Sequence, residues 1–207
     1  MTIGKLFVIS APSGTGKTSL VRALIDEDRA ISVAVSHTTR PRRSGEKEGI
    51  NYHFVTEQTF QGMVDANEFI EWACVFGYLY GTSLSAVEKE LARGKDLILE
   101  IDWQGADQIR QRVESVKTIF LFPPSHKALR DRLVKRAQDD KETVKKRLSN
   151  AMEELSHYQE FDYLVVNDDF TIALNELRQI IHGRGHFLHR STNLPKLQGL
   201  LADLGIG

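Results

Sequence analysis

The chain has 207 residues, enough for one α/β domain with small added subdomains and a sizeable buried core. Apolar residues make up 41% of the sequence, charged residues 27%, and the formal net charge is -1, which is typical of a globular enzyme and excludes general disorder and indiscriminate nucleic-acid binding. No apolar run approaches the roughly 20 residues that cross a bilayer, so we expect no membrane insertion. The lone Cys74 forms no internal disulfide, and the N-terminus has none of the features of a secretory leader, so we expect a cytosolic location.

Four strand-like runs are each followed by a segment with helical character. They lie at 5–10, 96–101, 116–122 and 163–166. This alternation predicts an α/β fold in which a parallel sheet is flanked by helices. The first helix is expected over 18–26, where Leu20, Leu24 and Ile25 form an apolar stripe.

Two segments depart from the alternation. Residues 36–83 contain short β-like pieces, many aromatic residues and a turn-prone stretch at 41–49, which indicates an inserted subdomain. Residues 127–147 carry nine Lys or Arg against four Asp or Glu, which fits either a lid or a solvated helix pair with alternating charges. We interpret 4–35, 84–126 and 148–184 as the core. We expect the tail at 185–207 to pack peripherally or to fray.

The strongest chemical signal lies between the first strand and its helix. It is the eight-residue turn made by Ala11, Pro12, Ser13, Gly14, Thr15, Gly16, Lys17 and Thr18. The turn departs from the strict Walker pattern, because Ala11 stands in place of the first glycine and is less permissive in its backbone angles. Backbone N–H groups of such a loop surround phosphate oxygens, Lys17 neutralises the β and γ phosphates, and Thr18 ligates magnesium.

The alternative for this turn is a flexible loop with an exposed lysine. It is disfavoured because strand, turn, Gly-Lys-Thr and helix occur in the required order. The loop alone leaves kinases, ATPases and GTPases open, so the acceptor must be identified elsewhere.

Downstream motifs narrow the choice. They are Ser36-His37-Thr38-Thr39-Arg40-Pro41-Arg42-Arg43, then Glu46, Gly49, Tyr52 and Phe54, followed by Phe69-Ile70-Glu71-Trp72 and Tyr80-Gly81-Thr82. With the phosphate loop, this series over about 4–184 resembles the bacterial-type guanylate kinase family. The resemblance implies a P-loop nucleoside monophosphate kinase fold, with a GMP-binding subdomain at about 36–83 and a helical lid at about 127–147. It also implies that the GMP phosphate is held by Arg40, Arg43, Tyr52 and Tyr80, and that guanine is surrounded by Ser36, Glu71, Thr82 and Asp102.

The implied roles make chemical sense. Two guanidinium forks and two phenols suit a phosphate dianion. A Glu71 carboxylate only accepts hydrogen bonds, which suits the adjacent N1–H and N2–H₂ donors of guanine and not adenine. Taken singly, the arginines also fit a basic surface turn, the tyrosines fit packing, and Glu71 fits a solvent-facing strand position.

Two carboxylates, Glu100 and Asp102, alternate at the end of the 96–101 run, which places both on one strand face. Ligands of α/β sheets lie beyond the carboxyl ends of the strands, so these groups suit guanine, or magnesium and its waters. Asp102 equally suits the N-cap of the helix that follows.

In the basic segment, Arg132, Arg136 and Arg147 match the arginines with which the family surrounds the transferring phosphoryl group. Ala137-Gln138 departs from the family's usual Gly-rich lid. Asn167-Asp168 resembles the family's adenine-side contact, with an ordinary turn or cap as the alternative.

The resemblance implies in-line transfer of the ATP γ-phosphoryl group to GMP or dGMP, giving ADP and GDP. Mg²⁺, alignment and positive charge supply the rate enhancement, and the nucleophile is already an oxyanion that needs no protein base. The partners are then ATP and GMP, with neither nucleic acid nor membrane. Two alternatives stay open: a non-catalytic interaction module of the same fold, against which Lys17 and Thr18 count, and a P-loop kinase of a sugar phosphate, against which Glu71 counts.

Overall fold

The computed structural model describes residues 3–136 and 141–207, with the side chains of 136–144 outside the described part. The chain divides into two units, which are described separately. The first contains the residues up to Val8 and Arg29–Val116, and the second contains Ile9–Asp28 and Lys117–Gly207. The strand β1 (Leu6–Ser10) belongs to both units, because the boundary falls between Val8 and Ile9.

A parallel sheet with the order β2-β7-β1 forms one part of the first unit. Here β2 (Ile31–Val33) pairs in parallel with β7 (Asp96–Glu100), and the N–H of Leu97 donates to the carbonyl of Lys5 at 2.8 Å. The unit's helices on this side are α3 (Leu84–Ala92) and α4 (Trp103–Arg112). The central residues of β7 are apolar and buried, as expected for a strand that is covered on both faces.

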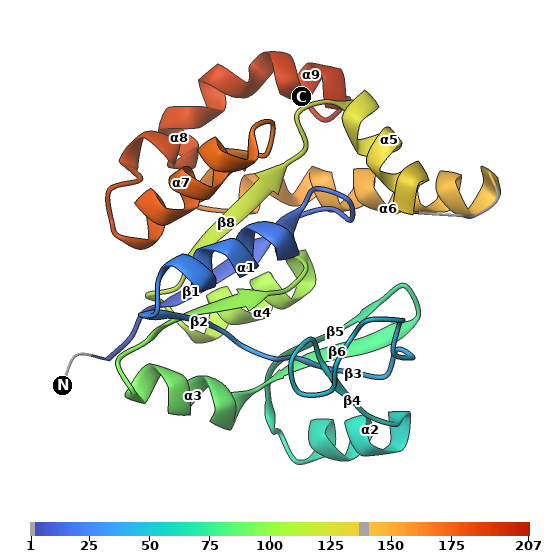
Figure 1. Ribbon diagram of the computed structural model, residues 1–207, viewed down its shortest axis with the longest axis vertical. Helices are drawn as coiled ribbons and strands as arrows, with labels where there is room; N and C mark the ends of the chain where they lie inside the picture. The colour runs from blue at the N-terminus through green and yellow to red at the C-terminus, as the bar shows by residue number, and fades with distance from the viewer. Residues whose placement is uncertain (1–2, 137–140) are drawn as a thin grey trace. The chain divides into compact units, whose positions relative to one another are not determined.

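A second, four-stranded sheet with the order β4-β3-β6-β5 completes the first unit (Figure 1). Its strands are β3 (His37–Thr38), β4 (His53–Phe54), β5 (Phe69–Val75) and β6 (Tyr78–Ser83), and α2 (Glu57–Asp65) connects β4 to β5. Phe76 and Gly77 join β5 to β6 with φ angles of 55° and 81°, as a two-residue hairpin turn with positive φ at both positions requires. All of these strands lie within the segment for which we predicted an inserted subdomain.

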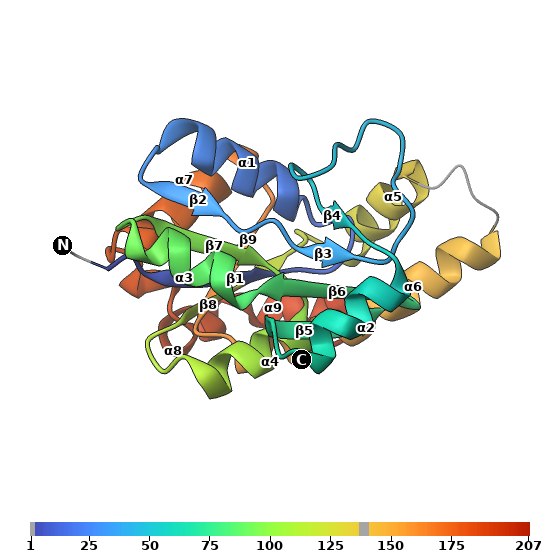
Figure 2. The same cartoon turned by 90° about the horizontal axis from the view of Figure 1, so that it is seen from below.

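In the second unit, β8 (Lys117–Phe122) and β9 (Tyr163–Val166) pair in parallel, in the order β1-β8-β9. Its core holds the rings of Phe120 and Phe161, whose centroids lie 5.1 Å apart and which are both fully buried. The helical segments of this unit are α1 (Lys17–Glu27), α5 (His126–Arg136), α6 (Lys141–Ser156), η1 (His157–Glu160), α7 (Phe170–Ile181), η2 (His186–Leu188), α8 (Arg190–Asn193), η3 (Leu194–Leu197) and α9 (Gln198–Leu204), several of which are visible in Figure 2.

The predicted α/β fold, parallel strands flanked by helices, is confirmed, and each of the four predicted strands is present to within a residue of its expected ends. One detail differs. In α1 the buried stripe consists of Leu20, Val21 and Leu24, and Ile25 is only half-buried. Of the two outcomes expected for the tail, the structure shows packing, since the tail forms short helices and buries Leu201 and Leu204.

The further division into core, inserted subdomain and lid stays a prediction. Among the described residues, no helix is both long and apolar enough to cross a membrane.

Candidate active site

The loop between β1 and α1 has the backbone of a phosphate cradle. Gly14 and Gly16 have φ angles of +89° and +99°, which side-chain-bearing residues rarely adopt, and Gly16 caps the start of α1. Lys17 and Thr18 are the first two residues of this helix, where the backbone N–H groups of the first turn and the helix dipole favour an anion. Within the described residues, the non-glycine positions with positive φ are Asn67 and Phe76, so Ala11 requires no conformation reserved for glycine.

Two side chains of the same unit donate hydrogen bonds to the backbone of this loop. The Asn167 side chain, 5% exposed, donates from Nδ2 to the carbonyl of Thr15 at 2.6 Å. Arg132 donates to the carbonyls of Thr15 and Asn167, at 3.3 Å each. A Cβ at Gly16 would lie 2.6 Å from Asn167 Nδ2, so the close approach requires glycine. In this structure Asn167 and Arg132 therefore fix the loop, and their expected roles at adenine and at the moving phosphate stay predictions.

The other predicted lid arginines are placed less completely. Arg136 is the last residue of α5, but its side chain lies outside the described residues, as do 137–140 altogether. Arg147 lies in α6 and is half-buried. The assignment of a lid to this segment thus stays a prediction.

Arg40 is buried rather than part of a basic surface turn. Its side chain is 7% exposed, with Nη2 2.7 Å from Glu46 Oε1 and Nη1 donating to the carbonyl of Pro41 at 2.7 Å. Burial alone lowers the pKa of Arg40, but the hydrogen bonds with Glu46 and Tyr80 raise it above its ordinary value. Arg40 therefore provides a fixed positive charge shortly after β3 of the four-stranded sheet.

Two phenols lie beside this guanidinium. The ring of Tyr52 is 5.5 Å from the Arg40 guanidinium carbon and 5.8 Å from the ring of Tyr80, edge to face. Burial raises the pKa of Tyr52 to about 12, with the nearby Tyr80 and Glu100 adding to the rise, so its hydroxyl stays a hydrogen-bond donor. Arg43 is exposed, and its backbone N–H donates to Glu46 Oε2 at 2.8 Å. The structure therefore brings Arg40, Tyr52 and Tyr80 together and leaves the Arg43 side chain at the surface.

Glu71 is a buried carboxylate and not a solvent-facing strand residue. It is 3% exposed, and its Oε1 accepts a hydrogen bond of 2.5 Å from Thr82 Oγ1, which lies 3.1 Å from Ser36 Oγ. Burial raises the pKa of Glu71 to about 7; Asp102 adds to the rise and the Thr82 hydrogen bond opposes it. A buried acceptor-only group of this kind is costly unless donors reach it. The cluster Ser36, Thr82 and Glu71 is thus built to receive hydrogen-bond donors.

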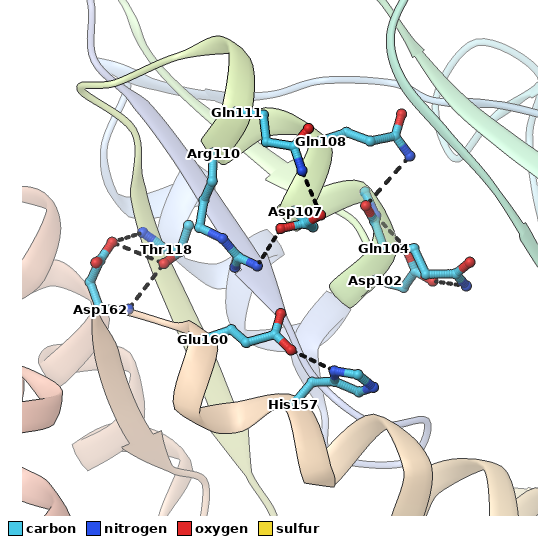
Figure 3. Close-up of polar contacts among 11 residues, drawn as sticks. Asp102, Gln104, Asp107, Gln108, Arg110, Gln111, Thr118, His157, Glu160 and Asp162 are labelled. Atoms are coloured by element: carbon cyan, nitrogen blue, oxygen red, sulfur yellow. Dashed lines mark hydrogen bonds and ion pairs between the residues drawn. The ribbon is translucent and has the colours of Figure 1, made fainter.

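Glu100 and Asp102 do not share a strand face, because β7 ends at Glu100. Asp102 instead caps α4: its Oδ1 accepts from the N–H of Gly105 at 3.0 Å, and its Oδ2 accepts from Gln104 Nε2 at 3.0 Å (Figure 3). The N-cap expectation is confirmed. Both residues are half-buried, and contact of either with guanine or a magnesium-bound water stays a prediction.

Sequence reasoning missed the support around Glu71. Gln108 pairs with the outer edge of β5, accepting from the Trp72 N–H at 3.2 Å and donating to its carbonyl at 2.7 Å. Arg112 Nη1 donates to the carbonyls of Phe69 and Ile70 at 3.1 and 2.6 Å. The one signal for these residues was their spacing of four on α4, which places both on the same helix face.

Comparison with known proteins identifies the family. The family model described as guanylate kinase matches residues 3–184. A guanylate kinase of Alkalilimnicola ehrlichii is 52% identical over 201 residues, covering 97% of this chain and 98% of that protein, and one of Haemophilus ducreyi is 47% identical over 204 residues, covering 98% of each. The crystal structure of guanylate kinase from Anaplasma phagocytophilum superimposes with a TM-score of 0.75 at 33% identity, covering 95% of this chain and 94% of that one. The chain belongs to the guanylate kinase family, and its fold is the P-loop nucleoside monophosphate kinase fold that its sequence predicted.

Proposed function

We propose that the protein transfers the γ-phosphoryl group of ATP to GMP, and also to dGMP, giving ADP and GDP in purine nucleotide metabolism. The observation that carries the proposal is the buried Glu71 carboxylate, supported by Thr82 and Ser36. Guanine presents N1–H and N2–H₂ as adjacent donors to such a carboxylate, whereas adenine has an unprotonated N1 and no N2 amine. AMP would leave a buried charge unsatisfied, which costs several kcal/mol and gives strong selectivity (on the order of 10⁴-fold).

The GMP phosphate binds beside Arg40, Tyr52 and Tyr80 in this proposal, and Arg43 closes on it from the surface. A fixed guanidinium with two phenols provides charge and directed donors for a dianion. Because that dianion is itself the nucleophile, no side chain has to remove a proton. Glu100 and Asp102 contact guanine, or the waters of a bound magnesium ion, in the same proposal.

On the donor side, Lys17 and the loop N–H groups hold the β and γ phosphates. Asn167 acts at the adenine end, and Arg132, Arg136 and Arg147 stabilise the charge that spreads over the moving phosphoryl group. The donor atoms also fit Mg²⁺: Thr18 offers an exposed hydroxyl oxygen in the first turn of α1, and the ion usually takes one or two protein oxygens besides phosphates and waters. Bound there, it would neutralise charge on the phosphate oxygens.

The two alternatives are not favoured. An interaction module would have no need of a loop with Lys17, Thr18 and two glycines at positive φ. A kinase of a sugar phosphate would have no use for a buried acceptor-only carboxylate at Glu71. The cytosolic location belongs to the same proposal and is supported by the lone, unpaired Cys74.

The substitution Glu71→Gln tests the base assignment, because it keeps the side-chain size and replaces an acceptor by an amide that also donates. We expect kcat/KM for GMP to fall by about 10²-fold or more, with the KM for ATP unchanged. Steady-state ADP release with each substrate varied in turn measures both constants. Equal losses for GMP and ATP would mean that Glu71 is only structural.

A further inference from the structure

Gly105 leaves the space that the Glu71 carboxylate occupies. It is the third residue of α4 and is buried, and a Cβ built on it would lie 2.5 Å from Glu71 Oε2 and 3.3 Å from Glu71 Cδ. Contacts of a Cβ below about 3 Å essentially do not occur, so an alanine at this position requires that something move. The group in the way is the carboxylate that reads guanine in the proposed function.

That carboxylate has little freedom to yield. Its other oxygen, Oε1, is tied to Thr82, and the hypothetical Cβ also lies only 3.2 Å from Ile101 Cδ1. The strand on either side of Glu71 is fixed to α4 itself, through Arg112 at the carbonyl of Ile70 and through Gln108 at Trp72. A Cβ would therefore act directly on the carboxyl group and break its alignment with Thr82.

The helix alone gives no reason for a glycine here. Gly105 is not among the residues with positive φ, so its backbone conformation is open to alanine, and glycine within a helix costs about 1 kcal/mol relative to alanine. Its N–H donates to Asp102 Oδ1, a bond that any residue but proline can make. What only glycine provides is the absence of a side chain toward Glu71.

We propose that Gly105 is a positioning residue for guanine selectivity, which fixes where the Glu71 carboxylate meets the N1–H and N2–H₂ donors of the base. The proposal rests on the proposed function of Glu71. It adds that the selectivity of the site depends on a helix residue that has no side chain and does not touch the substrate.

The test compares Gly105→Ala with Gly62→Ala. Gly62 lies in α2, and nothing is within 4 Å of a Cβ built there, so the control adds the same methyl group to a helix without a clash. We expect Gly105→Ala to raise the KM for GMP by about tenfold or more, while the KM for ATP changes by less than about twofold. Gly62→Ala should leave both constants unchanged.

A rescue variant separates positioning from general damage. Glu71→Asp shortens the side chain by one methylene and makes room for the new methyl group. The KM for GMP of the double variant should therefore rise by less than the product of the two fold-increases in the single variants. The difference between the observed rise and that product measures the coupling of the two residues.

The proposal is overturned if Gly105→Ala keeps the wild-type KM for GMP, if it weakens GMP and ATP alike, or if the two losses simply multiply. Should Gly105→Ala fail to fold, adding Glu71→Asp must restore folding, and continued unfolding rejects the proposal as well. Calorimetric measurement of GMP binding by the wild-type protein distinguishes failure of the proposed function from failure of the role of Gly105. Absence of binding there rejects the proposed function and the role of Gly105 together, whereas binding with an unaffected Gly105→Ala rejects only the latter.

Discussion

At the residue scale, the most unusual group is Glu71, because its carboxyl group is buried and its hydrogen-bond partner is the neutral hydroxyl of Thr82. Its pKa rises from 4.5 to about 7 chiefly through burial, so the carboxyl is easier to keep protonated in the folded than in the unfolded protein. In the proposed function, a base that donates two hydrogen bonds relieves this cost. A buried carboxyl group with a raised pKa favours a functional over a stabilising role.

The raised pKa predicts a pH dependence of stability. The stabilising contribution of the protonated Glu71 is fully present below pH 4.5 and is lost as the pH rises through about 7, since the unfolded chain gives up this proton more readily. Relative to Glu71→Gln, the free energy of unfolding of the wild-type protein should fall over that window, by no more than about 3 kcal/mol. Urea unfolding of both proteins at pH 4.5, 6 and 8, without nucleotide, measures the difference. Parallel pH profiles would show that the carboxyl titrates normally.

At the element scale, the phosphate loop depends on the end of β9. Asn167 directly follows this strand, and its amide holds the Thr15 carbonyl. Conversion of Asn167 to Asp keeps the shape but removes the donor and sets a negative group against a carbonyl and near the predicted phosphates. We expect the KM for ATP to rise about tenfold, with the KM for GMP little changed.

Asn175→Asp serves as the control for this substitution, since Asn175 is an exposed residue of α7 and undergoes the same exchange of amide for carboxylate. Steady-state kinetics with ATP varied at saturating GMP, and the reverse, provide the comparison. An Asn167→Asp enzyme with a normal KM for ATP would show that the loop keeps its shape without the hydrogen bond from Asn167 to Thr15.

The elements also show which parts of the fold are readable from sequence. Buried strands such as Lys117–Phe122 form continuous apolar runs, and their ends follow from composition. The strand Ile31–Val33 was missed because three residues carry no measurable periodicity. For the tail, packing and fraying both stayed open because its apolar residues are spread over short helices, and the burial of Leu201 and Leu204 decides that it packs.

At the scale of the whole molecule, the predicted site residues fall into two groups by chain segment. Those assigned to GMP lie in the unit that contains Arg29–Val116, and those assigned to ATP and the phosphoryl transfer lie in the unit that contains Ile9–Asp28 and Lys117–Gly207. Each group thus belongs to one unit by its chain segments. This separation matches a reaction in which one unit selects the acceptor and the other holds the donor.

The sequence proposed the candidate site residues but not the residues that support them. Lys17, Arg40 and Glu71 can be identified from sequence because they are charged residues within ordered motifs. The resemblance to a family supplied their expected roles. Gly105, Gln108 and Arg112 support Glu71 through close packing and backbone contacts of α4 with β5. The spacing of four between Gln108 and Arg112 places them on one helix face but does not reveal which strand that face contacts. The same reason hid the contact of Asn167 and Arg132 with Thr15, because these residues are far apart in the chain.

The central claim is that this protein phosphorylates GMP with ATP, and coupled ADP release with a set of acceptors tests it most directly. The set is GMP, dGMP, AMP and a sugar phosphate, with Lys17→Ala as the control for a contaminating kinase. We predict rapid ADP release with GMP and dGMP, at least about 10³-fold less with AMP, and none above background from Lys17→Ala. Comparable turnover with AMP or the sugar phosphate, or no acceptor-dependent release at all, would contradict the account.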